Sequence, residues 1–159
     1  MPTLHTVDES FFKTAPVIYA AYWDIPRPAA EVWGELTQNP LYWCRGFKAQ
    51  WRTPAPHGVG SVKTVKVLGA LVADEHYFVW EEGRRKAFFV ATANLPLYKT
   101  LAEDYLVEPL SDEACRLTWT IAADPTGFGR VNGPAFSGLI GSFFKDTARH
   151  FGASTVRSR

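Results

Sequence analysis

The chain contains little cysteine and almost no excess of charge. Its two cysteines, Cys44 and Cys115, could form at most one bridge, and the sequence does not show whether they pair. The formal net charge is +1 and the basic residues are scattered, which argues against a nucleic acid partner. The one tight basic cluster, residues 84–86, is interpreted as a polar turn.

Long apolar runs and targeting signals are also missing. No stretch approaches ~18 consecutive apolar residues, so we expect no transmembrane helix. The first thirteen residues carry Asp8 and Glu9 and have no apolar core, so no secretory signal peptide is expected. A reducing cytoplasm with free thiols is therefore the expected location.

Signatures of catalysis and metal binding are absent from the sequence. The four histidines are widely separated, and together with the two cysteines they show no zinc-ligand spacing. There is no G-x-S-x-G nucleophile motif, and the glycine pairs at 58–60 and 127–129 are not phosphate loops. We therefore expect no metal and no cofactor, and whether the chain is an enzyme stays open at this point.

Aromatic residues are abundant, with six Trp, six Tyr and eleven Phe in 159 residues. A chain of this length is the usual size of one domain and can form a sizeable core without disulfides. Bulky rings fill a small core inefficiently, so they indicate either a tightly packed core or a pocket lined by rings.

The order of the predicted elements indicates an α+β fold. A β-branched and aromatic strand at 16–25 is followed by a helix that begins at Pro28 and ends near Asn39, and by a second short helical turn at 41–45. Strands are predicted at 47–52, 61–68, 73–82, 85–94, 100–109 and 114–124, with hairpins at 82–84 and 110–113. A helix of about five turns then begins near Pro134 and ends at Gly152.

This pattern predicts an antiparallel sheet of about six to seven strands wrapped around the long C-terminal helix. Residues 1–15 are expected to form an arm or short edge element, residues 16–152 the domain, and residues 153–159 a frayed tail.

Four segments, residues 25–43, 58–67, 76–89 and 103–120 with the helix after them, carry a resemblance to a known family. In order and spacing they resemble the START-like (SRPBCC) superfamily, also called the helix-grip or birch-pollen-allergen fold. More narrowly, they are similar to its polyketide cyclase/dehydrase and lipid-transport branch. The resemblance implies a cavity between the sheet and the helix.

Strand alternation selects candidate residues for that cavity. Trp119 shares the apolar face of its strand and should face the helix. Glu103 lies among apolar residues of the same parity, which makes it either a pocket acid or a group paired with an arginine or tyrosine. His76 is either a pocket base, whose partner the sequence does not identify, or an exposed or simply satisfied histidine. The inward face of strands 73–82 and 85–94 stays open, because both faces carry rings. The candidate ligand-binding residues are Trp43, Phe78, Trp80, Phe88, Tyr105, Trp119, Phe136, Ile140, Phe143 and Phe144.

Three functions are compatible with these observations. The first is binding or carriage of a small hydrophobic or aromatic ligand, lipid-like or polyketide-like, by a monomer or homodimer. The second is an enzyme that resembles aromatase/cyclases or dehydratases, with Glu103 and His76 as acid and base. The third is a regulatory or interaction module with a vestigial cavity.

Overall fold

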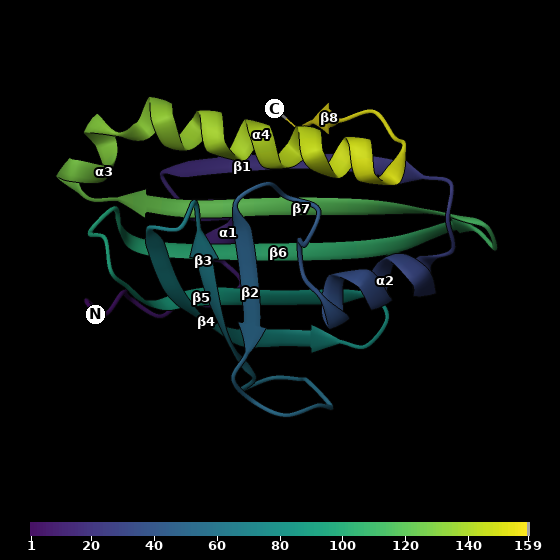
Figure 1. The fold of residues 1–159 in the computed structure, drawn as a ribbon, viewed down its shortest axis with the longest axis horizontal. Coiled ribbons are helices and arrows are strands. Elements are labelled where there is room, and N and C mark those ends of the chain that lie inside the picture. Colours follow the sequence, from purple (N-terminus) through teal and green to yellow (C-terminus); the bar gives the residue numbers. More distant parts are fainter. Residues whose placement is uncertain (159) are drawn as a thin grey trace.

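The computed structural model describes residues 1–158 and contains an eight-stranded antiparallel sheet with a long C-terminal helix (Figure 1). The strands are β1 (Val17–Ile25), β2 (Phe47–Trp51), β3 (Val62–Val67), β4 (Leu71–Glu81), β5 (Arg85–Ala93), β6 (Tyr98–Ser111), β7 (Ala114–Pro125) and β8 (Val156–Arg157). The helices are α1 (Phe11–Thr14), α2 (Ala29–Gln38), α3 (Gly127–Val131) and α4 (Gly133–Phe151). The predicted α+β helix-grip architecture is confirmed.

The sheet order is β2-β3-β4-β5-β6-β7-β1-β8, so β2 to β7 form a meander and β1 pairs with β7. Helix α4 lies along β1 and β7, while β2 and β3 cross in front of the longer strands (Figure 1). Its sheet-facing residues, Ile140, Phe143, Phe144 and Phe151, are buried in the core. Gly152 ends the helix in the left-handed conformation, at a φ of 63°, as its position predicts.

The segment after α2 differs from the prediction. Residues 41–45 form turns rather than a second helix. Leu41 has a φ of 56°, and a left-handed residue cannot continue a right-handed helix. Only one helix therefore follows β1, and the turn that replaces the second one brings Leu41 into the core.

Residues at the C-terminus form an eighth strand where a frayed tail was expected. Val156 and Arg157 pair with Tyr22 and Ala21 of β1. The indole Nε1 of Trp23 donates a hydrogen bond of 3.0 Å to Thr155 Oγ1 and anchors the same segment. The chain after α4 is thus held by backbone and side-chain hydrogen bonds that its local sequence does not predict.

Residues 2–5 bond between the ends of β5 and β6, and α1 after them packs on the face of the sheet opposite α4 (Figure 1). Leu4 is buried, and its N–H donates to the carbonyl of Ala91 at 2.9 Å. The ring of Phe12 stacks on that of Phe78 with 6.2 Å between centroids. Helix α1 therefore covers Phe78 on the outer face of β4, whereas Leu4 belongs to the core.

The connection between β7 and α4 contains a short helix, α3. Thr126 caps it, since its hydroxyl oxygen accepts a 3.0 Å hydrogen bond from the Gly129 N–H. A Cβ at Gly129 would lie 1.8 Å from the carbonyl oxygen of Leu97. Glycine at this position is what allows α3 to approach the loop between β5 and β6.

Candidate functional site

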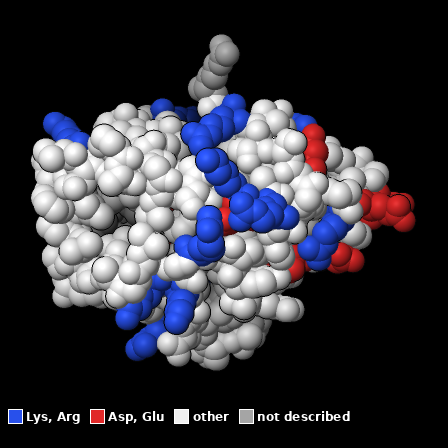
Figure 2. Space-filling view, turned by 45° about the horizontal axis from the view of Figure 1, so that its top comes forward, with Lys and Arg blue, Asp and Glu red and all other residues white. Residues whose placement is uncertain are grey.

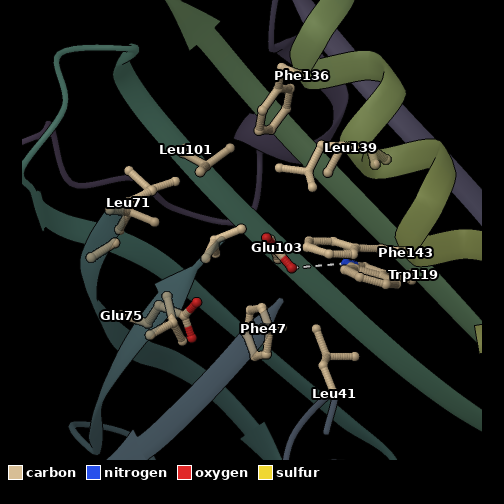
Figure 3. Close-up of a pocket in the computed structure, with 15 residues that line it drawn as sticks. Leu41, Phe47, Leu71, Glu75, Leu101, Glu103, Trp119, Phe136, Leu139 and Phe143 are labelled. Carbon is tan, nitrogen blue, oxygen red and sulfur yellow. Dashed lines mark hydrogen bonds between the residues drawn. The ribbon is translucent and has the colours of Figure 1, made fainter. Parts of the chain in front are cut away.

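A cavity of about 60 Å³ lies between the sheet and α4. It is lined by fifteen residues, all apolar or aromatic except Glu75 and Glu103 (Figure 3). These are Leu41, Phe47, Val65, Val67, Leu71, Ala73, Glu75, Val90, Leu101, Glu103, Trp119, Phe136, Leu139, Ile140 and Phe143. A space of this volume holds a few water molecules but is smaller than the usual site for an organic ligand.

A larger apolar hollow of about 330 Å³ adjoins the inner cavity near the start of α4. The two share four lining residues, Val67, Leu71, Phe136 and Leu139. Figure 3 shows Leu71, Phe136 and Leu139 together at one end of the inner cavity, away from Leu41. These side chains separate the two spaces, which together reach the size of a typical small-molecule site.

Glu103 on β6 lies at the centre of the inner cavity (Figure 3). Its Oε2 accepts two hydrogen bonds, at 2.7 Å from the Tyr105 hydroxyl and at 2.9 Å from Trp119 Nε1. Burial raises the pKa of Glu103 to about 7, the nearby Glu75 adds to the rise, and the two hydrogen bonds oppose it. Glu103 is thus both a cavity acid and the hydrogen-bond partner of a tyrosine. The sequence analysis had treated these two roles as alternatives.

Glu75 on β4 is the second carboxyl of the cavity and is 3% exposed. It stands directly opposite Lys63 of β3, and the Lys63 Nζ lies 2.8 Å from Glu75 Oε2. The same ammonium donates a 2.9 Å hydrogen bond to the Tyr77 hydroxyl. Burial raises the pKa of Glu75, although Lys63 opposes the change.

The charge on Lys63 is maintained by its partners. Burial disfavours the ammonium, but Glu75 and Tyr77 more than offset this and raise the pKa of Lys63. A buried ion pair therefore stands beside the cavity, and its positive charge neutralises the carboxylate of Glu75.

Lys86 is buried on the inner face of β5, whereas the sequence placed it in a polar turn. Its ammonium donates to the carbonyl of Leu36 in the last turn of α2 and lies 5.7 to 5.9 Å from four aromatic ring centroids. Burial and the nearby Lys63 lower the pKa of Lys86 well below its ordinary value. Since Lys86 is directed toward α2, it does not line the cavity.

Five of the twelve predicted site residues line the cavity. Glu103, Trp119, Phe136, Ile140 and Phe143 line it directly. The Tyr105 hydroxyl donates a hydrogen bond to Glu103, and the ring of Phe88 stacks on that of Tyr105. Phe144 packs edge-on against Trp119 and Trp23 and is part of the solid core.

The predicted role of β4 residues requires correction. His76 and Phe78 point to the face away from the cavity, where His76 lies near Phe89 and Phe78 packs against Phe12. His76 is therefore not placed to act as a pocket base. A bulge between Tyr77 and Val79 interrupts the strict alternation of the strand.

Because of the bulge, Trp80 does not share the face of His76 and Phe78. It lies with Tyr77 on the inner side, edge-on to Trp33, but outside the cavity lining. Trp43 is also outside the lining: its Nε1 donates to Thr147 and its ring stacks on His150 at 4.6 Å. From the same part of the chain, Leu41 and Phe47 line the cavity instead.

Two functional candidates, Glu75 and its partner Lys63, escaped the sequence reasoning. The signal was present, because Lys63 shares the parity of Val65 and Val67, and Glu75 shares that of Ala73 and Tyr77. Two opposite charges on apolar faces of adjacent strands indicate a buried pair once the register is known.

Basic residues that are far apart in the sequence gather on the outer side of α4 (Figure 2). Arg45, Lys145, Arg149 and Arg157 line a polar hollow of about 380 Å³ there. The buried carboxyl of Asp146 lies 3.2 Å from Arg149 and 3.6 Å from Arg45 and orients both. The positive charge is therefore less scattered than the sequence suggests, while the expected absence of a nucleic acid partner stays a prediction.

Over residues 1–158, no cluster of three or more histidine, cysteine or acidic side chains is arranged to hold a metal. Cys44 and Cys115 are buried and unpaired. Among the helices of this same range, none has the length and apolar character needed to cross a membrane.

Comparison with known proteins identifies relatives of this chain in mycobacteria. No family profile matches the sequence. The uncharacterized proteins Rv2574 of Mycobacterium tuberculosis and Mb2604 of Mycobacterium bovis are each 32% identical to it over 125 residues, which are 76% of this chain and 74% of each relative.

Solved structures share the fold at low sequence identity. A START superfamily protein from Mycobacterium smegmatis matches with a TM-score of 0.66 and 12% identity, over 83% of this chain and 92% of that one. The major latex-like protein 151 of Panax ginseng matches with a TM-score of 0.62 and 16% identity, over 85% of this chain and 97% of the ginseng chain. The chain therefore belongs to the family of the mycobacterial proteins and has the START-like, birch-pollen-allergen-like fold that its sequence resembles.

Proposed function

We propose that the chain binds a small hydrophobic molecule in the space between the sheet and α4. The observation that carries this proposal is an interior cavity whose wall is apolar at every residue but two, next to an apolar hollow that shares four of its residues. Pockets for small molecules have this composition, with a few polar groups that orient the ligand. The START-like fold of the chain supports the same function.

Entry into the inner cavity requires side-chain movement. Leu71, Phe136 and Leu139 stand between the outer hollow and the carboxyls, and Phe136 and Leu139 are only partly buried. Rotamer changes of such side chains are fast and inexpensive compared with a backbone rearrangement. A ligand would thus join the two spaces into one site.

A cavity-filling substitution tests the proposal. Ala73 lines the inner cavity, and Ala73→Leu would occupy it, whereas Ala30 is exposed on α2 and Ala30→Leu is the matched control. Binding of n-butylbenzene, followed by calorimetry, should weaken at least tenfold in Ala73→Leu and stay unchanged in Ala30→Leu. Absence of binding to the native chain, or equal binding by both variants, would contradict the proposal and favour an interaction module with a vestigial cavity.

An acid–base enzyme is the second candidate, and the cavity position of Glu103 is the observation that favours it. With a pKa raised to about 7, this carboxyl could hold or release a proton near neutral pH. His76 lies on the other face and would take no part. Turnover of a polyketide-like substrate that survives in Glu103→Gln would argue against this candidate.

A further inference from the structure

The two carboxyls of the cavity each have an oxygen that is free to meet a ligand. Within the described chain, the hydrogen bonds from Tyr105 and Trp119 both go to Glu103 Oε2, and none reaches Oε1. The only polar contact of Glu75 there is the Lys63 ammonium at 2.8 Å from its Oε2. Both side chains are among the residues that line the cavity.

Such oxygens need a partner, because a polar group buried against an apolar wall is costly when it forms no hydrogen bond. The rest of the wall, from Leu41 to Phe143, offers no other hydrogen-bonding side chain except the indole of Trp119, whose N–H is already used by Glu103. The missing donor therefore has to come from outside the protein, either as water or as a group on the ligand.

The charges around the cavity restrict what that group can be. Lys63 neutralises Glu75, and Lys86 donates to the Leu36 carbonyl of α2, outside the cavity. No cation in the described chain contacts Glu103. An incoming carboxylate or phosphate would meet the oxygens of two acids, whereas a hydroxyl or an amine could donate to them.

We propose that the ligand of this site is an apolar molecule with a single hydroxyl or amine at one end, whose apolar body extends toward Leu71 and Phe136. A hydroxyl donates its one hydrogen bond to Glu103, and an ammonium can donate to Glu75 as well. This inference rests on the proposed function and narrows it to a chemical class. Fatty acids and other apolar anions should bind more weakly, because the same arrangement offers them no unpaired cation. The polar end lies innermost, and the outer hollow surrounds the apolar end.

Four probes with one skeleton test the class. 4-Phenylbutan-1-ol, 4-phenylbutylamine, 4-phenylbutyrate and n-butylbenzene differ in the terminal group, which is neutral, cationic, anionic or absent. At pH 7 the alcohol and the amine should bind at least tenfold more tightly than the carboxylate, as measured by calorimetry. The hydrocarbon should bind more weakly than the alcohol, because it leaves the carboxyl oxygens without a donor.

The variant Glu103→Gln tests whether the Glu103 carboxyl causes the preference for the amine over the carboxylate. The amide oxygen can still accept from Tyr105 and Trp119, so the shape of the site is retained while the acid is removed. The preference for the amine over the carboxylate should fall at least fivefold in this variant. Glu108→Gln, at an exposed position of the same strand, should leave it unchanged.

The outcomes separate this inference from the proposed function. If none of the four probes binds, the proposed function fails for ligands of this size. If the probes bind but the carboxylate equals or exceeds the alcohol and the amine, the cavity binds ligands and the inference is wrong. The order of the four affinities in the native chain tests the inference even if Glu103→Gln does not fold. Glu75→Gln then provides a second variant, in which the preference for the amine over the carboxylate should also decrease.

Discussion

Replacement of Glu103 by glutamine should make the folded chain more stable at alkaline pH. In the native protein, burial raises the pKa of Glu103 from 4.5 to about 7. Between these two values the folded chain retains a proton that the unfolded chain has lost, so stability decreases as the pH rises through this window. Glutamine cannot ionise and therefore avoids this loss.

The size of the effect follows from the two pKa values. A carboxyl whose pKa rises from 4.5 to about 7 costs the fold about 3 kcal/mol once both states are ionised. Because the glutamine oxygen keeps both hydrogen bonds, little is lost in exchange. We expect the free-energy difference between Glu103→Gln and the native chain to change by about 2 to 3 kcal/mol, in favour of the variant, between pH 5 and pH 8.

Urea unfolding followed by tryptophan fluorescence at both pH values measures this difference. Lys63 is present in both proteins. The repulsion between Glu103 and Glu75 exists only in the native chain and acts in the same direction as burial. Glu108→Gln on the exposed part of β6 should show no such pH dependence. A Glu103→Gln variant that is less stable than the native chain at pH 8, or whose difference from it does not vary with pH, would refute the reasoning.

Three further predictions concern the surroundings of the cavity. Lys63→Met leaves the Glu75 carboxylate buried without its cation and should lower the free energy of unfolding, measured with urea, by about 3 to 5 kcal/mol. Adding Glu75→Gln to the same chain should restore part of this stability, and a decrease below about 1 kcal/mol in Lys63→Met would contradict the buried pair. Gly129→Ala places a methyl group against the carbonyl of Leu97 and should lower stability by about 1 to 3 kcal/mol in a thermal scan, whereas an unchanged melting temperature would show that the contact is not close. Burial raises the pKa of the Cys44 thiol to about 12, so at pH 8 it should react with a thiol reagent only after unfolding, and rapid labelling of the folded chain would oppose this placement.

The sequence pattern was sufficient for the main elements of the fold. Strand alternation, the two hairpins and the phenylalanine stripe from Phe136 to Phe151 depend on local chemistry, and the sheet and α4 occur where these signals indicate. Strand β8 depends instead on pairing with β1 and on the bond from Trp23 to Thr155, which are set by the tertiary structure. Local signals carry no information about such contacts.

The same distinction applies to the site. Trp119 and Glu103 were predicted correctly to face inward, because β6 and β7 alternate regularly there. Phe78 and Trp80 were both named as ligand-binding candidates, because nothing in the sequence marked the bulge between Tyr77 and Val79. Lys86 was assigned to a turn from its basic neighbours, although its burial depends on the position of α2, which only the folded structure provides.

A crystal structure of the chain with 4-phenylbutan-1-ol would show where a ligand and its polar end lie. We expect the alcohol between the sheet and α4, with its hydroxyl oxygen within hydrogen-bonding distance of a Glu103 carboxyl oxygen and its ring next to Phe136. An alcohol bound with its hydroxyl toward Phe136 and the outer hollow would contradict the role of the carboxyls. An inner cavity that stays empty in crystals saturated with the alcohol would contradict the ligand site itself.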